Sequence, residues 1–195
     1  MVTINPQKIE GNWRAGVALD FHTTSSTPIG QNEYGHMQFH TVRPEIAELL
    51  YRLKYRSDQL AAQGIIMAAA TYLRPHRPKF DLMIPVPPST MRAFQPVLII
   101  ANGIGAAVGM PVVQCVTTTH PTLPLKSVSD PEKRKELLDG LYQVDTCRTV
   151  GRNVLLFDDL FRSGSTMNAI TDVLLQQGQA ASVCVLTITR TRSNQ

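Results

Sequence analysis

Residues 153–166, NVLLFDDLFRSGST, run an apolar segment directly into two aspartates and then into a short loop of hydroxyls and one glycine. The apolar part, residues 154–157, predicts a buried strand, because a strand covered on both faces reads as a continuous apolar run. The adjacent carboxylates of Asp158 and Asp159 raise each other's cost of ionisation, so a purely structural role is unattractive unless cations or donors meet them. The stretch therefore predicts a strand that leads into a ligand site.

The loop after the aspartates has the composition of an anion site. Arg162, Ser163, Gly164, Ser165 and Thr166 connect the strand to a helix expected over residues 165–177. Glycine lets the backbone approach a ligand closely, and the first amides of a helix point outward at the positive end of its dipole. The alternative is a polar turn in which Ser163 or Ser165 caps the helix. A P-loop nucleotidase is excluded, because no lysine follows a glycine as the G-x-x-x-x-G-K-S/T loop requires.

Strands and helices alternate through most of the chain. Helical spacing of apolar residues begins at Pro44, and further helices are expected over residues 58–73 and 96–109. Strands are expected over residues 81–87, 110–118, 153–159 and 181–189. Strands separated by helices predict an α/β fold with a parallel central sheet and right-handed crossovers, a Rossmann-like architecture. In such a sheet the ligand crevice lies outside the carboxyl ends of the strands, where the two aspartates are expected.

The N-terminal segment has a different pattern. Residues 13–26 and 33–42 are alternating and β-prone, and TPIGQN between them carries Pro, Gly and Asn turn signals. The pattern predicts a small antiparallel hairpin or meander. We therefore expect a β-rich hood over residues 1–43 and a core over residues 44–195, within one structural domain. One strand face there carries His36, Gln38 and His40, and we expect this polar face, together with Asp20 and His22, to belong to a hood over an acceptor pocket.

The composition limits the partners. The chain has 195 residues, 43% of them apolar, with 19 Lys and Arg against 15 Asp and Glu and a net charge of +4. An excess of basic residues suits phosphate-rich ligands, but it leaves nucleic acid open as a partner, since no basic run marks a nucleic-acid arm. No signal peptide or membrane span is evident, so we expect a cytoplasmic protein without a membrane partner. A homodimer stays open.

The segment VLLFDDLFRSGST resembles the phosphoribosyl pyrophosphate (PRPP) motif of type I phosphoribosyltransferases. The similarity extends toward the ComF/GntX-like branch of that family through LLYRLKYRSDQLA, DLMIPVP, AAVGMPV and EKRKELLDGLYQV, over roughly residues 49 to 190. The N-terminal zinc-binding cysteines of that branch are missing here, and the β-rich segment stands in their place. The resemblance implies a glycosyltransferase of nucleotide metabolism that uses PRPP and Mg2+, transfers the 5-phosphoribosyl group to an unidentified acceptor and releases pyrophosphate.

The resemblance also implies roles for matching residues. Asp158 and Asp159 would be catalytic, engaging the ribose hydroxyls and contacting Mg2+ indirectly, and the loop from Arg162 to Thr166 would bind the 5′-phosphate. The loop after residue 86 would bind pyrophosphate. Because Pro87 and Pro88 have no N–H, the first amides available there follow them, with an arginine as the nearest charge. The residues expected in this pyrophosphate site are Pro88, Ser89, Thr90 and Arg92. Two basic residues, Lys126 and Arg134, are candidates for a mobile lid, the alternative being a solvated loop and a basic helix face.

Arg162 departs from the pattern of purine-using relatives, which have an aspartate at this position. An arginine stays protonated and cannot act as a general base, so we expect no hypoxanthine-like acceptor. It could instead hold a phosphate or meet an anionic acceptor. The alternative function is a catalytically reduced PRPP or nucleotide sensor, or a ComF-like accessory protein in DNA uptake or processing. A scaffold domain without a ligand is a third possibility.

Overall fold

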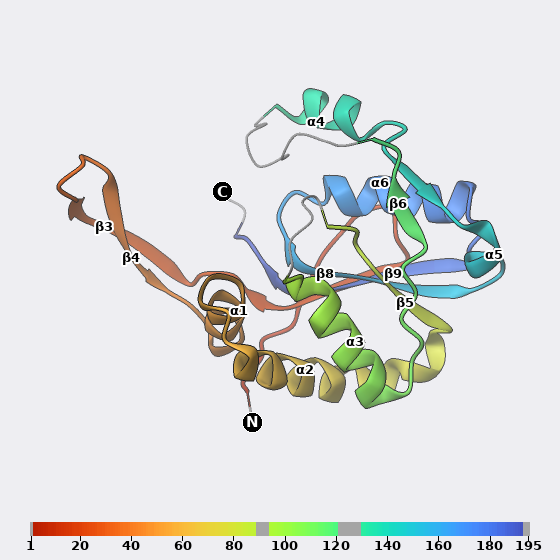
Figure 1. Ribbon diagram of the computed structural model, residues 1–195, viewed down its shortest axis with the longest axis horizontal. Helices are drawn as coiled ribbons and strands as arrows, with labels where there is room; N and C mark the ends of the chain where they lie inside the picture. The colour runs from red at the N-terminus through yellow and green to blue at the C-terminus, as the bar shows by residue number, and fades with distance from the viewer. Residues whose placement is uncertain (1, 89–93, 121–129, 193–195) are drawn as a thin grey trace.

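The computed structural model describes residues 2–88, 94–120 and 130–192. A five-stranded sheet in the order β1-β2-β9-β8-β5 forms its centre (Figure 1). Its strands are β1 (Gln7–Lys8), β2 (Ala15–Phe21), β5 (Leu82–Pro85), β8 (Asn153–Phe161) and β9 (Ser182–Arg190). The neighbours β2, β9, β8 and β5 run parallel, and only the edge strand β1 is antiparallel. The predicted α/β fold with a parallel central sheet is confirmed.

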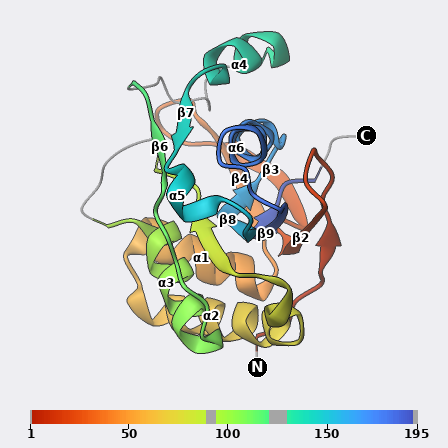
Figure 2. The same cartoon turned by 90° about the vertical axis from the view of Figure 1, so that its right-hand side faces the viewer.

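Helices cover both faces of the sheet (Figures 1 and 2). The helices α1 (Glu45–Arg56), α2 (Gln59–Leu73) and α3 (Pro96–Val108) lie on one face, and α6 (Ser165–Gln176) lies on the other. The start of α2 is fixed by Asp58, whose carboxylate accepts hydrogen bonds from the amides of Leu60 at 3.1 Å and Ala61 at 3.2 Å. Such an N-cap satisfies amides that have no acceptor within the helix.

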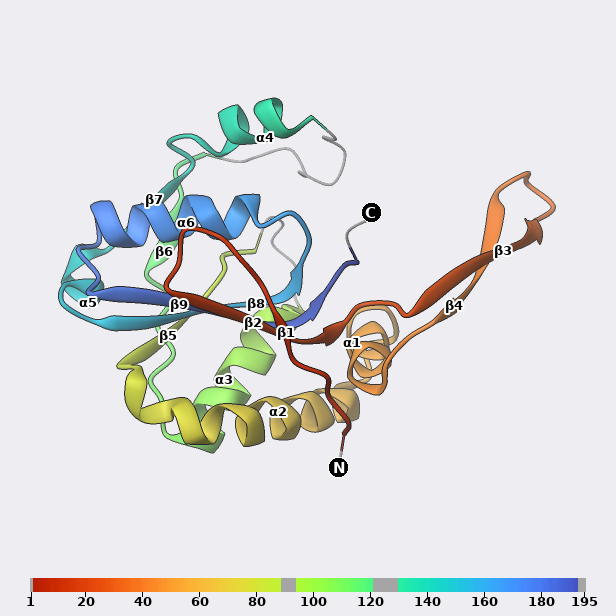
Figure 3. The same ribbon diagram turned by 180° about the vertical axis from the view of Figure 1, so that it is seen from behind.

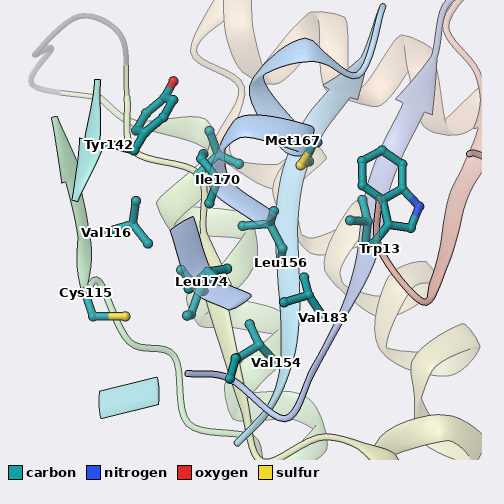
Figure 4. Packing of buried hydrophobic residues seen from close by; sticks show 14 of the residues in the cluster. Trp13, Cys115, Val116, Tyr142, Val154, Leu156, Met167, Ile170, Leu174 and Val183 are labelled. Carbon is teal, nitrogen blue, oxygen red and sulfur yellow. The ribbon is translucent and has the colours of Figure 1, made fainter. Parts of the chain in front are cut away.

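The sheet separates two apolar cores. One core packs α6 and Trp13 on Val154, Leu156 and Val183 (Figure 4). The other packs the α1–α3 layer on Leu155 and Phe157 among others. Successive side chains of a strand point to opposite faces, so β8 contributes alternately to the two cores. This alternation also decides where the following aspartates lie.

Shorter elements extend the body. They are a 3₁₀ helix η1 (Arg74–Lys79), β6 (Val116–Thr118), α4 (Pro131–Leu138), β7 (Tyr142–Val144) and α5 (Thr146–Thr149). The strands β6 and β7 form a separate antiparallel pair. The strand expected over residues 110–118 is therefore mostly wrong: Val112 makes a single parallel bridge to Met83, and only the last three residues are a strand. Pro111 has no N–H to continue a ladder at this edge.

The structure does not divide the chain at residue 43, where the hood was predicted to end. Residues 15–21 form β2, which pairs with β9 inside the central sheet, so this part of the N-terminal segment belongs to the core. The separate hairpin is formed instead by β3 (Ser25–Gln31) and β4 (Met37–Val42), and it projects from the body (Figures 1 and 3).

The predicted turn TPIGQN lies mostly within β3. A register shift between Pro28 and Gly30 accommodates these two residues in the strand. The turn forms later, where the Asn32 side chain accepts hydrogen bonds from the amides of Tyr34 at 3.0 Å and His36 at 2.9 Å. Asparagine side chains that bond their own backbone in this way nucleate turns.

Candidate functional site

The two aspartates lie within β8 and not at its end. The strand continues to Phe161, and Asp158 is in register with Thr187 of β9. Because neighbouring side chains of a strand point to opposite faces, Asp159 lies on the α1 side and Asp158 on the α6 side. The prediction that they emerge together at the strand end is thus corrected: the pair is split across the sheet.

Asp159 is buried and ion-paired. The Lys54 ammonium, in the last turn of α1, lies 2.8 Å from Oδ2 and 3.0 Å from Oδ1 of this carboxylate. The backbone carbonyl of Asp159 also accepts a hydrogen bond from the Thr189 hydroxyl at 3.3 Å. The structure makes Lys54 the partner of the second acid. Contacts from one ammonium to both carboxylate oxygens fix the orientation of the Asp159 side chain. Removing either partner would leave a charge with little water around it.

Asp158 has no ion pair among the residues that the structure describes. Its Oδ1 accepts a hydrogen bond from the Asp159 amide at 2.8 Å. Burial, and next the charge of Asp159, raise the pKa of Asp158 above its ordinary value, while the amide and Lys54 oppose the shift. A carboxylate in this situation is stabilised in its charged form by a bound cation or by hydroxyl donors.

Tyr142 of β7 links Asp158 to the loop that follows. Burial and the charge of Asp158 raise the pKa of Tyr142 to about 12, and a hydrogen bond with Thr166 opposes the shift. The phenol is therefore neutral at physiological pH. Sequence reasoning missed this residue, because a three-residue strand gives no local sign of which side chains it will face.

The loop between β8 and α6 presents an uncapped helix start. Gly164 is the N-cap residue with a φ of 78°, and no side chain caps the helix. The alternative in which Ser163 or Ser165 caps α6 is not observed; their hydroxyls lie 3.0 Å from each other. The first amides of a helix have no acceptor within it. The start of α6 therefore presents amides of the kind that bind anions.

Gly164 is required for a second reason. A Cβ atom at this position would lie 3.1 Å from the ring of Phe161, in addition to the strain of a left-handed backbone. Trp13 in turn packs edge-on against Phe161, with ring centroids 6.0 Å apart and planes at 86°. The loop thus rests on two aromatic rings, and the second comes from the N-terminal segment. As the only tryptophan of the chain, Trp13 was a signal that the sequence offered and that we did not use.

The segment around Trp13 also binds the first half of α6. The Asn12 amide donates to the Asn168 side chain at 3.0 Å, and the Asn12 side chain donates to Asp172 at 2.6 Å. These contacts join the segment before β2 to the helix that follows the loop of residues 162–164. Residues before β2 therefore support the site, which the prediction of a separate hood did not foresee.

The other predicted site residues are placed as follows. Arg162 is exposed and lines a hollow beside the loop. Pro88 is half-buried and follows β5 at the same carboxyl edge of the sheet. The predicted residues Ser89, Thr90, Arg92 and Lys126 lie outside the described residues. Arg134 falls within α4, but its side chain is also outside the description.

Within the described ranges there is no group of three or more His, Cys, Asp and Glu side chains that could hold a metal ion. Magnesium takes oxygen ligands and is commonly held by one or two carboxylates together with phosphates of a substrate. Asp158 fits the part of such a carboxylate, because no cationic side chain among the described residues pairs with it. In the same ranges, no helix has the length and apolar character needed to cross a membrane.

The parallel central sheet with helices on both faces matches the fold of type I phosphoribosyltransferases. The chain is similar to adenine phosphoribosyltransferase from Trypanosoma brucei, solved with AMP, pyrophosphate and ribose 5-phosphate, with a TM-score of 0.51 and 11% identity over 94% of this chain and 75% of the other. This match shows the fold.

In sequence the chain is similar to the competence protein ComFC of Bacillus subtilis. The two are 24% identical over 155 residues, which is 77% of this chain and 62% of ComFC. The chain thus spans less than two thirds of that relative. No family model matches the chain. The predicted resemblance to ComF-like phosphoribosyltransferases is confirmed by these two comparisons.

Proposed function

We propose that the chain binds PRPP and Mg2+ at the carboxyl edge of the sheet and transfers the 5-phosphoribosyl group to an acceptor. One observation carries the proposal. The carboxylate of Asp158, which has no described cation partner, lies next to an uncapped helix start in a phosphoribosyltransferase fold. A sugar phosphate supplies what both features need, namely hydroxyl donors for the acid and an anion for the amides.

The proposed placement follows the chain. The amides at the start of α6 and the hydroxyls of Ser163, Ser165 and Thr166 bind the 5′-phosphate. Asp158, on the α6 side with this loop, accepts hydrogen bonds from the ribose hydroxyls, and we assign Asp159 to the same sugar where it reaches past the carboxyl edge of the sheet. Since Lys54 holds Asp159 rigidly, this acceptor needs little reorganisation when the sugar binds. The pyrophosphate is assigned to the segment after β5, from Pro88 to Arg92.

The reaction is a substitution at C1 of the ribose. The bond between C1 and the pyrophosphate oxygen breaks, pyrophosphate leaves with the electron pair, and a lone pair of the acceptor forms the new bond to C1. Positive charge develops on the sugar ring, and the nearby carboxylates stabilise it. Asp158 would hold magnesium indirectly, and the bound ion would supply positive charge to the leaving pyrophosphate. We assign no general base.

The test is pyrophosphate release by the full chain with PRPP, Mg2+ and a panel of acceptors. We expect release that depends on an acceptor and falls by about 100-fold or more in the double variant Asp158→Asn/Asp159→Asn, the scale for loss of preorganised electrostatic groups. The matched control is Glu33→Gln/Asp139→Asn, which removes two exposed carboxylates elsewhere. Equal rates in the two double variants would contradict the assignment of the acids.

A second candidate function rests on the similarity to ComFC, whose name marks it as a competence protein. In this alternative the chain is a PRPP or nucleotide sensor, or an accessory protein in DNA uptake or processing, that keeps the pocket without turnover. Binding of PRPP with Mg2+ but no pyrophosphate release with any acceptor favours the sensor. Salt-dependent DNA binding that PRPP does not change favours the accessory protein.

A further inference from the structure

A charged hollow adjoins the loop between β8 and α6. It has a volume of about 360 Å3, and its lining residues come from the end of β1, from the carboxyl ends of β8 and β9, and from the segments after β1 and β8. Its lining residues are Lys8, Glu10, Phe161, Arg162, Ser163 and Arg190. Because Ser163 belongs to the loop proposed to hold the 5′-phosphate, a ligand in this hollow would be a neighbour of the bound sugar phosphate.

The hollow has an excess of positive charge. Three of its lining side chains are cationic and only Glu10 is anionic. Glu10 pairs with Lys8 at 2.8 Å, and both side chains are 79% exposed, so water screens this pair. In the described part of the chain, neither arginine of the hollow has a carboxylate within 4.0 Å. Two guanidinium charges are left for a ligand.

Arg190 is held in place without being neutralised. Its Nη1 donates to the carbonyl of Lys8 at 2.9 Å, and its Nε donates to the carbonyl of Thr191 at 3.4 Å. Carbonyl acceptors orient a guanidinium but leave its full charge, and Arg162 brings a second charge from the loop itself. A planar guanidinium fork binds a carboxylate through two parallel hydrogen bonds.

The remaining wall of the hollow is aromatic. Phe161 lines it, and Trp13 fixes the ring of Phe161 from behind by the edge-on contact. A rigid ring beside guanidinium groups suits a flat ligand that carries a negative charge. The 5′-phosphate already has its own place at the start of α6, so the hollow is available to the other substrate.

We propose that this hollow binds the carboxylate of the acceptor, so that the chain acts on a planar, carboxylate-bearing acceptor and not on a neutral base. The inference rests on the proposed function and deepens it, since it names the chemical class of the second substrate. It also gives Arg162 a role: the residue that cannot be a general base is a specificity-determining cation.

The test compares acceptor pairs that differ in the carboxylate: orotate with uracil, nicotinate with nicotinamide, and benzoate with benzamide. Calorimetry measures binding of each compound to the full chain loaded with ribose 5-phosphate, so that no transfer takes place. At least one acid is expected to bind about tenfold or more tightly than its neutral partner, with the difference reduced by added salt. Arg190→Gln is expected to weaken binding of that acid about tenfold, and Arg152→Gln, an exposed arginine elsewhere, is the control.

The outcomes separate this inference from the proposed function. If ribose 5-phosphate and PRPP do not bind to the wild type, the proposed function fails. If PRPP binds but every neutral compound binds as well as its acid, or no acid binds at millimolar concentration, the hollow is not an acceptor carboxylate site. The inference is also overturned if Arg190→Gln retains the full preference. Unchanged PRPP affinity in Arg190→Gln confirms that the variant is folded and that the sugar phosphate site is intact.

Discussion

The β8–α6 segment and the β3–β4 hairpin each combine β-structure with a short loop, but they differ in how deeply their strands are buried. In β8, six of the nine residues are buried, and both of its ladders are parallel pairings inside the sheet. Every residue of β3 is exposed, and so is every residue of β4 except the half-buried Thr41. Packing can therefore hold unfavourable features in β8, such as adjacent acids, whereas the hairpin has no such support.

This contrast assigns different tasks to the two regions. The strained and charged features of the site lie where many neighbours determine their positions, as preorganised sites require. The hairpin instead presents the apolar side chains of Ile29, Met37 and Phe39 to solvent. We therefore expect substitutions near β8 to change both stability and ligand binding, and changes in the hairpin to leave the core and its site intact.

The largest effect on stability is expected for Trp13→Ala. Trp13 is 7% exposed and packs on Phe161 beneath the anion loop. Truncating a buried tryptophan costs about 3 kcal/mol or more, which corresponds to a loss of several degrees in Tm for a chain of this size. Thermal unfolding monitors stability, and PRPP affinity in the same variant is expected to fall because the loop loses its support. An unchanged Tm would show that the N-terminal segment is not part of the core.

Next in size is the comparison of Gly164→Ala with Gly35→Ala. Both glycines have positive φ, 78° and 76°, but an added Cβ meets the Phe161 ring at Gly164 and nothing within 4 Å at Gly35 in the hairpin turn. An alanine in this left-handed backbone conformation costs about 1 kcal/mol at either position. The contact with the Phe161 ring adds to this cost only at Gly164. Denaturant unfolding should therefore show the larger loss for Gly164→Ala. Equal losses would mean that the ring moves freely and the loop is not fixed by it.

A smaller effect, opposite in sign, is expected for Asp158→Asn. The pKa of Asp158 is raised in the folded protein, so the ionised form of this side chain destabilises the fold. This destabilisation is absent at pH values below the ordinary pKa of an aspartate and grows as the pH rises toward the raised pKa. An asparagine keeps the acceptor for the Asp159 amide but has no charge. The variant should therefore raise Tm by a few degrees at pH 8 and by less at pH 5. A gain that is larger at pH 5 would contradict the assigned direction of the pKa shift.

The smallest effect is expected for removal of the hairpin. Ser25 and Val42 are cross-strand partners at its base, so residues 26–41 can be replaced by Asn-Gly, which closes a two-residue turn. Since the removed residues are almost all exposed, Tm should change by no more than about 3 °C. PRPP affinity should be unchanged as well. A large loss of either would show that the hairpin is integrated with the core.

Local sequence patterns were sufficient for the elements that pack by regular periodicity. The apolar run of β8, the helical spacing in α1 and the Asp58 cap of α2 were predictable because each signal lies within a few residues. The β2 strand was misassigned to the hood because an alternating run does not tell which sheet it joins. Only the tertiary fold places it beside β9, where Ala18 pairs with Thr187.

The sequence offered the candidate residues of the site but not the contacts between them. The two acids and the loop could be found because they are contiguous. The ion pair between Lys54 and Asp159 joins residues 105 positions apart, and the contact of Trp13 with Phe161 depends equally on the fold. Long-range pairings of this kind leave no local pattern. The same reason explains why Arg190 was not associated with Arg162 before the structure showed their common hollow.

The central claim is that the acids on β8 and the loop after them hold PRPP. The most direct measurement is calorimetric titration of the full chain with PRPP and Mg2+, repeated with Asp158→Asn/Asp159→Asn and with the control Glu33→Gln/Asp139→Asn. The account predicts binding by the wild type and the control, and loss of binding in the acid variant although it remains folded. Equal binding by the wild type and the acid variant would contradict it.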